Sequence, residues 1–152
     1  MTTLTQDECL VALAQGSVGR VAITAQALPA IVPVNYALNA HTIVFRTRTD
    51  GMLARACDGS VVAFEVDQLA ANGRTGWSVL VVGVANLLSG SGAVRALELN
   101  LASAAGEDRD QFVSIAIGRI SGRRIGDGVL TESAGLGWAS AGGDELGVAS
   151  CP

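Results

Sequence analysis

Short, closely spaced apolar segments fill most of this chain, and most of their residues are β-branched or aliphatic. Glycine, proline and small polar residues separate these segments, as they do between β-strands. The pattern predicts six strands, at residues 18–24, 30–38, 42–48, 61–67, 77–88 and 111–120. Strands at this spacing, joined mostly by short turns, indicate a mainly β fold. They favour a small antiparallel barrel over a parallel sheet with crossover helices.

Three other segments have helical character. Residues 5–15 begin with Thr5 and Glu8, a pair that can form a capping box, and Gly16 ends the segment. Residues 50–57 are long enough for two helical turns. Residues 91–104 place Val94, Leu97 and Leu101 on one stripe, which predicts a helix late in the chain.

Two residues interrupt the strand pattern. Pro33 lies inside the second predicted strand, and proline in a sheet indicates an edge or a bulge. Gly83 lies within the longest predicted strand, where glycine indicates a bend or a bulge.

The composition changes after residue 125. The stretch 126–152 holds seven glycines and four acidic residues with no basic one, and we interpret it as a flexible extension with Trp138 as a single anchor. The chain has 152 residues, 49% of them hydrophobic and 16% charged, so residues 1–125 are expected to form one domain with a true core. The net charge of −4 argues against nucleic-acid binding.

The counts of reactive residues exclude several chemistries. All ten basic residues are arginine, so a lysine Schiff base and a P-loop lysine are excluded. His41 is the single histidine and falls in a predicted turn, which excludes His-rich zinc sites and predicts no metal.

The cysteines and the N-terminal segment bear on location. The cysteines, Cys9, Cys57 and Cys151, are far apart and fit a reducing cytoplasm better than a disulfide framework. Asp7 and Glu8 interrupt the first apolar stretch, so no signal peptide is expected. The strongest apolar run, residues 79–85, is too short to span a membrane.

The densest polar group is the segment Arg46-Thr47-Arg48-Thr49-Asp50-Gly51, where a predicted strand meets a predicted helix. Two guanidinium groups, two hydroxyls and free backbone N–H groups are the components of a phosphate site. If the strand continues, Arg46 and Arg48 share a face and could share one anion. The alternative is a solvated strand end with ordinary surface arginines.

Two further segments have candidate binding residues. Val34, Asn35 and Tyr36 combine the single tyrosine with an amide in an otherwise apolar strand, which suits a planar heterocycle; the alternative is that Tyr36 is a core aromatic. Trp77 and Ser78 begin the longest strand, where tryptophan most often serves packing.

The order of these segments resembles a known family. The stretches GRVAIT, PAIVPVNYAL, TIVFRT, VVAFEVD, GWSVLVVGVA and VSIAIGRISGRRI follow one another as in the pyridoxamine-5′-phosphate-oxidase-like flavin-binding split β-barrel family, in particular its nitroimidazole-reductase-like actinobacterial branch. The resemblance covers roughly residues 4–125. It implies a six-stranded Greek-key barrel, a homodimer, and FMN in a cleft between subunits, with flavin-dependent hydride transfer to or from a small organic substrate.

The resemblance also assigns roles to residues. Val34, Asn35 and Tyr36 would lie along the flavin ring, and Arg46 and Thr47 would meet the phosphate. Thr49 and the start of the short helix would close around the phosphate. Ser78 and Trp77 would face the same cleft from one subunit or the other.

Two departures from the family pattern keep alternatives open. Met52 stands where family members usually have lysine, so the phosphate charge would come from Arg48 or Arg55. A basic pair for pyridoxamine phosphate is also missing, which argues against vitamin B6 oxidation. The deazaflavin F420 fits the same fold, and a non-catalytic flavin-binding or degenerate barrel dimer is the other alternative. Haem would need an axial ligand, for which His41 is poorly placed.

Overall fold

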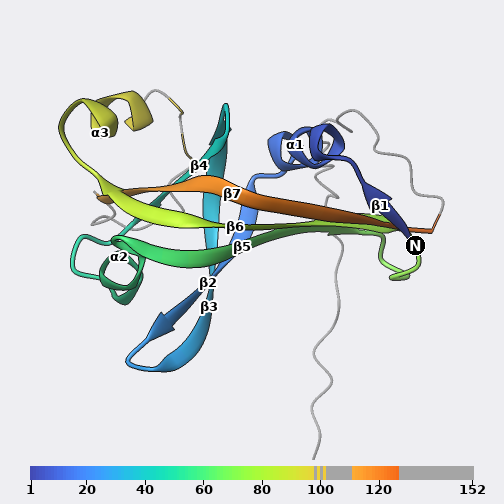
Figure 1. The fold of residues 1–152 in the computed structure, drawn as a ribbon, viewed down its shortest axis with the longest axis horizontal. Coiled ribbons are helices and arrows are strands. Elements are labelled where there is room, and N and C mark those ends of the chain that lie inside the picture. Colours follow the sequence, from blue (N-terminus) through green and yellow to red (C-terminus); the bar gives the residue numbers. More distant parts are fainter. Residues whose placement is uncertain (98, 100, 102–110, 127–152) are drawn as a thin grey trace, which may run out of the picture.

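Six strands close into an antiparallel barrel in the computed structural model, which describes residues 1–97, 99, 101 and 111–126 (Figure 1). Around the barrel the order is β7-β4-β3-β2-β5-β6, and β6 pairs back with β7. The strands are β2 (Val18–Ala25), β3 (Leu28–Asn39), β4 (Thr42–Thr47), β5 (Ser60–Leu69), β6 (Gly76–Leu88) and β7 (Gln111–Ile125). This confirms the mainly β, six-stranded barrel predicted from the sequence.

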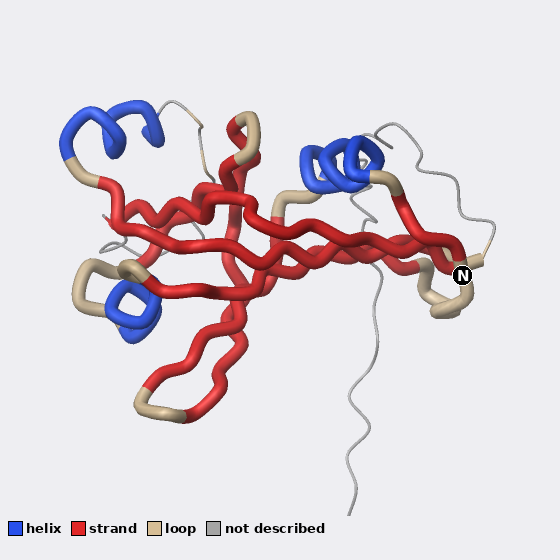
Figure 2. Tube along the Cα trace, in the orientation of Figure 1, coloured by secondary structure: helices blue, strands red, loops and turns tan. Residues whose placement is uncertain are grey.

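The connection after β4 gives the barrel its Greek-key topology. Strands β2, β3 and β4 form a meander, but β5 then pairs with β2 and not with β4. The chain makes this crossing through the short helix α2 (Met52–Cys57), whose Leu53, Ala54 and Cys57 are buried. Figure 2 shows the helices at the periphery of the strands.

The two predicted interruptions have the expected structural causes. Pro33 lies opposite Arg20 of β2, whereas the pairing of β3 with β4 begins only at Tyr36, so the proline stands where β3 has a strand on one side. Between Val82 and Gly83 the register against β7 shifts, which is the predicted bulge. A side chain on Gly83 would collide with the carbonyl oxygen of Ala116.

The helices pack on the barrel from outside. Helix α1 (Gln6–Gln15) begins with the predicted capping box: the Glu8 amide donates to Thr5 Oγ1 at 3.2 Å, and the Thr5 amide donates to Glu8 Oε2 at 2.8 Å. Helix α3 (Gly90–Leu97) covers a second apolar cluster formed by Val44, Ala96 and Phe112.

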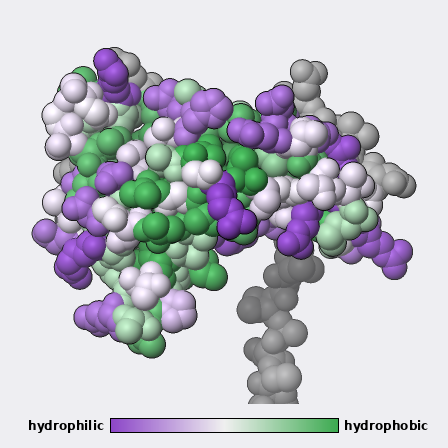
Figure 3. Space-filling model, viewed as in Figure 1, coloured by the Kyte–Doolittle hydropathy of each residue, from purple (hydrophilic) through white to green (hydrophobic). Residues whose placement is uncertain are grey.

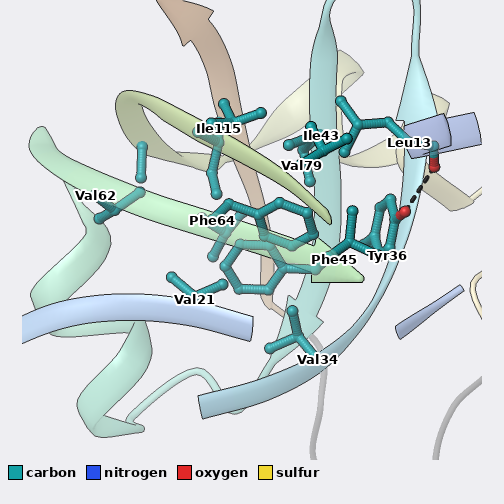
Figure 4. Packing of buried hydrophobic residues seen from close by; sticks show 14 of the residues in the cluster. Leu13, Val21, Val34, Tyr36, Ile43, Phe45, Val62, Phe64, Val79 and Ile115 are labelled. Carbon is teal, nitrogen blue, oxygen red and sulfur yellow. Dashed lines mark hydrogen bonds between the residues drawn. The ribbon is translucent and has the colours of Figure 1, made fainter. Parts of the chain in front are cut away.

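The barrel interior holds the main core (Figure 4). Its largest fully buried side chains include two phenylalanines and two isoleucines from the three strands β4, β5 and β7: Phe45, Phe64, Ile43 and Ile115. These residues alternate with outward-facing ones, as the period of a strand requires.

Several boundaries differ from the prediction. A short strand, β1 (Thr2–Leu4), was not predicted; it pairs with β7 at Gly122–Arg124, and three residues are too few to show an alternating pattern. Strand β7 continues to Ile125 because β6 offers partners along its whole length. Helix α3 ends at Leu97 and Leu99 is already in a turn, so a helix reaching residue 104 is wrong. The acidic extension at 127–152, with Trp138 and Cys151, lies outside the described residues.

Candidate functional site

A pocket of about 590 Å³ lies between the β2–β3 hairpin and helix α2. Its lining combines a guanidinium group with apolar walls and two uncharged polar side chains: Thr24, Ala25, Gln26, Leu28, Pro29, Ala30, Met52, Arg55 and Ala56. A volume of this size falls within the range of small-molecule sites. The pocket is therefore a candidate ligand-binding site.

Arg55 is the charged residue of this pocket. Its Nη1 donates to the carbonyl oxygen of Asp50 at 2.8 Å, which ties the guanidinium to the segment that leads into α2. The remaining N–H groups of an exposed arginine are free to face water or an anion. Met52 and Leu28 are 46% and 70% exposed and provide apolar surface beside that charge.

The hairpin that forms the opposite wall has an unusual turn. Gln26 and Ala27 both have positive φ values, 51° and 63°. A two-residue turn of this kind normally has asparagine and glycine at these positions, since other residues are strained there. The strained turn carries Gln26 and Leu28 to the pocket.

The predicted phosphate residues at the end of β4 differ in burial and in the face of the strand that they occupy. Arg46 is half-buried on the outer face, its guanidinium carbon 5.2 Å from the centre of the Phe112 ring, whereas Thr47 is buried at 8% exposure. Because β4 ends at Thr47, Arg48 leaves the strand and does not share a strand face with Arg46. Arg48 and Thr49 are exposed in a turn, which the Gly51 amide closes by donating to the Arg48 carbonyl oxygen at 3.0 Å.

The predicted ring-binding residues of β3 alternate between the two faces. Val34 and Tyr36 are buried at 5% and 4% exposure, and Asn35 between them faces outward. Three successive strand residues cannot share one face, so a flavin outside this barrel would meet the Asn35 side chain and the β3 backbone.

Tyr36 is part of the barrel core. Its hydroxyl donates to the Leu13 carbonyl oxygen at 2.6 Å, and its ring packs edge-on against Phe64 with centroids 4.8 Å apart (Figure 4). Burial raises the pKa of the Tyr36 hydroxyl well above its usual value. This is the core-aromatic alternative that the sequence left open.

Trp77 and Ser78 lie away from the hairpin pocket. Trp77 is 5% exposed, and its Nε1–H donates to Gln68 Oε1 at 3.2 Å. It lines a separate hollow of about 240 Å³ next to the end of α1, with Gln15–Val18 and Val66–Gln68. Ser78 is half-buried on the outer face, opposite Asp67 of β5.

The structure thus distributes the predicted site over three places. Met52 lines the hairpin pocket, and Arg48 and Thr49 precede it in the adjoining turn. Asn35 and Arg46 face outward from the neighbouring strands β3 and β4, and both are next to the inward Tyr36–Phe45 pair on the same side of it. Trp77 lies at the other hollow.

Several pocket residues were not predicted: Thr24, Gln26, Leu28 and Pro29. In the sequence, the one signal for these residues is a short break between two strands, with no glycine and with a leucine directly before a proline.

Within residues 1–97, 99, 101 and 111–126, there is no group of three His, Cys, Asp or Glu that could hold a metal ion. Burial raises the pKa of the Cys57 thiol to about 11, as expected for an inert core cysteine. None of the helices in the described part is long and apolar enough to cross a membrane.

Comparisons with known proteins agree with this architecture. A curated relative, the uncharacterized protein Rv0080 of Mycobacterium tuberculosis, is 42% identical over 91 residues; the match covers 57% of this chain and 60% of the relative's length. A solved structure of an FAD-binding protein from Mycobacterium smegmatis is 28% identical, with a TM-score of 0.71 over 82% of this chain and 98% of that one. A conserved protein of unknown function, DIP1874 from Corynebacterium diphtheriae, is 30% identical, with a TM-score of 0.70 over 82% of this chain and 97% of that one.

The family model for pyridoxamine 5′-phosphate oxidase matches residues 5–124, which include all six barrel strands except Ile125, the last residue of β7. The likeness inferred from the order of the sequence segments is thereby confirmed, and the chain belongs to the pyridoxamine 5′-phosphate oxidase family.

Proposed function

We propose that this protein binds FMN and acts as an oxidoreductase that transfers hydride to or from a small organic substrate. The observation that carries the proposal is the pocket between the β2–β3 hairpin and α2, which joins a guanidinium group to apolar walls in a barrel of this family. The name of the M. smegmatis relative, an FAD-binding protein, supports a flavin as the ligand.

The residues of the pocket fit the parts of a flavin nucleotide. A flavin has a flat, largely apolar ring system at one end and a phosphate at the other. Leu28, Pro29 and Met52 offer apolar contact, and Arg55 offers a charge-assisted hydrogen bond to phosphate. Arg48, exposed in the turn before α2, is a second arginine near in sequence.

Because Met52 carries no charge, the positive charge that binds the phosphate must come from arginine in this chain. The family resemblance implies a lysine at this position, and methionine supplies no charge. We infer that Arg55, one helical turn further along α2, takes over the anchoring of the phosphate. Because its guanidinium is already held by the Asp50 carbonyl oxygen, less freedom is lost when it binds.

The bound flavin would supply the redox chemistry, while the protein would contribute binding, orientation and the exclusion of water. We further propose that the protein is a homodimer with the flavin near the subunit interface. In that dimer we expect Asn35 and Arg46, both predicted flavin residues, to contact the flavin. A cytoplasmic location and the absence of nucleic-acid partners remain predictions from the sequence.

The test is an ultraviolet–visible spectrum of the purified protein, followed by titration with FMN, FAD and F420. The proposal expects flavin absorption bands or saturable uptake of FMN in the micromolar range or tighter. Preference for FAD would keep the flavin and change its identity, and uptake of F420 alone would point to the deazaflavin alternative. A protein that binds none of the three would refute the proposal and leave the degenerate barrel.

Two arginine variants locate the site. Arg55→Ala is expected to weaken FMN binding by about 10- to 100-fold, because it removes a charged partner of the phosphate. Arg74→Ala, an exposed arginine in the β5–β6 loop, is the matched control and is expected to leave the affinity unchanged. Equal affinities of both variants and the parent protein would place the ligand elsewhere.

A further inference from the structure

Gln26 brings an uncommitted amide to the pocket between the β2–β3 hairpin and α2. Among the described residues that line this pocket, it is the only one with a side-chain amide. The amide carbonyl oxygen accepts hydrogen bonds, and the NH2 group beside it donates them. No hydrogen bond joins this amide to another residue in the part of the chain that the structure describes. Both groups are therefore available to a ligand.

The backbone of the hairpin turn gives no reason for a glutamine at this position. Gln26 and Ala27 have φ values of 51° and 63°, in the left-handed region where a residue with a Cβ atom is strained. Asparagine and glycine fit such a turn better. Ala27 shares the backbone strain but is not among the residues that line the pocket. The two neighbours thus separate the effect of the backbone from the effect of the Gln26 side chain.

The turn lies at the end of a two-stranded arm, residues 23–30. In the described structure, β2 pairs with β5 only at Arg20–Ala22 and β3 pairs with β4 only from Tyr36 onward, so the two strands of the arm pair with each other alone. Figure 1 shows the arm extending beyond the other strands on the side of α2, and Figure 3 shows hydrophilic and hydrophobic side chains together at its end. Gln26 belongs to the wall that the arm forms, and Arg55 belongs to the wall that α2 forms.

We propose that Gln26 binds the imide edge of the flavin, so that the ring system points toward the hairpin turn and the phosphate toward α2. This inference deepens the proposed function and rests on it. The pyrimidine end of a flavin presents an N–H group between two carbonyl groups, and a primary amide complements this edge with one acceptor and one donor. Arg55 holds the phosphate at the other end. The apolar side chains of Leu28, Pro29 and Met52 are left for the faces of the ring.

An imide edge fits Gln26 better than a phosphate or a hydrocarbon group does. A guanidinium group binds phosphate more strongly than an uncharged amide, and Arg55 offers one in the same pocket. A hydrocarbon group that displaced water from the amide would leave its donor and acceptor unpaired. Hydrogen bonds to the imide also fix the orientation of the ring, because apolar contacts to its faces do not distinguish one edge from another. Gln26 is therefore assigned as a residue that positions the flavin.

The test compares the affinity for FMN with that for 3-methyl-FMN, in which a methyl group replaces the hydrogen of the imide nitrogen, by fluorescence titration. The wild-type protein is expected to bind FMN about tenfold more tightly, because the analogue has no N–H to donate to the Gln26 carbonyl oxygen. Gln26→Met keeps a long side chain without the amide. It should bind FMN about tenfold more weakly than the wild-type protein does, and should bind the two ligands with equal affinity.

Ala27→Gly is the matched control, since it relieves the same backbone strain outside the pocket lining. It should raise the Tm of the cofactor-free protein by about 2–4 °C and keep the wild-type affinities for both ligands. Gln26→Gly should raise the Tm by a similar amount and yet lose the preference for FMN, because the strain and the amide are removed together. The same melting curves show that each variant is folded.

The outcomes separate the role of Gln26 from the proposed function. Equal affinities of the wild-type protein for FMN and 3-methyl-FMN, or a Gln26→Met variant that binds FMN as the wild-type protein does, overturn the role of Gln26 and leave FMN binding intact. A Gln26→Met variant that loses affinity but keeps the preference also overturns it, because the amide then acts away from the imide nitrogen. A wild-type protein that binds neither ligand refutes the proposed function, and the role of Gln26 with it.

Discussion

Replacing Tyr36 by phenylalanine removes one hydroxyl from the interior and decides whether this side chain serves the fold or a ligand. The hydroxyl donates to the Leu13 carbonyl oxygen at 2.6 Å. Leu13 lies in the last turn of α1, which ends at Gln15, and carbonyl groups there have no donor within the helix. The substitution therefore leaves a buried acceptor without its partner.

The cost follows from this geometry. A hydrogen bond of this kind contributes about 1 kcal/mol net, and a buried carbonyl left unpaired costs about 1–3 kcal/mol. The edge-on contact with Phe64 stays, because phenylalanine keeps the ring. We expect Tyr36→Phe to lower the free energy of unfolding by about 1.5–2 kcal/mol, which corresponds to a decrease in Tm of about 3–8 °C.

Urea unfolding followed by circular dichroism gives the free energy, and FMN titration of the same protein gives the affinity. The structure predicts a loss of stability with unchanged affinity, since the side chain is inside the barrel. Unchanged stability together with a large loss of FMN affinity would show that the hydroxyl serves the ligand and that the assignment of Tyr36 to the core is wrong.

Substitutions at four further positions test the fold. Thr5→Ala removes the capping box of α1 and should cost about 1 kcal/mol in urea unfolding, whereas Thr5→Ser should cost much less. Gly83→Ala forces a side chain against the Ala116 carbonyl oxygen and should destabilise the protein by several kcal/mol. Gly92→Ala in α3 meets ordinary contacts and should be neutral or slightly stabilising. Burial raises the pKa of Cys57 from 9.0 to about 11, so the folded state holds this proton more tightly than the unfolded state. The resulting stability is complete below pH 9 and decreases between pH 9 and 11 by up to about 1.4 kcal/mol per pH unit. Cys57→Ala should remove that part of the pH dependence, and identical slopes in both proteins would contradict it.

Local physical chemistry made much of the fold predictable. The apolar alternation located all six barrel strands, and the Thr5–Glu8 pair marked the start of α1, because these signals act between residues close in sequence. Pro33 and Gly83 were informative for the same reason: each constrains its own backbone, wherever the partner strand lies. Strand β1 was missed because three residues gain their pairing from β7, more than a hundred positions away.

The candidate site depended on tertiary structure. From sequence, Arg46 and Arg48 formed one group, but β4 ends between them, so one stays on the barrel and the other enters the turn before α2. Arg55 met Gln26 and Leu28 in one pocket only because α2 and the β2–β3 hairpin approach each other in space.

Composition and periodicity are properties of the chain alone, and they were enough to predict the class of fold, the strand segments and several chemistries that the chain excludes. Tertiary structure decided which side chains share a pocket, and that Val34 and Tyr36 fill the core while Asn35 faces outward. It also decided that Arg20 of β2 forms ion pairs with both Glu65 and Asp67 of β5. Strand registers and chain crossings set which side chains lie close together in space, and both follow from the packing of the whole barrel.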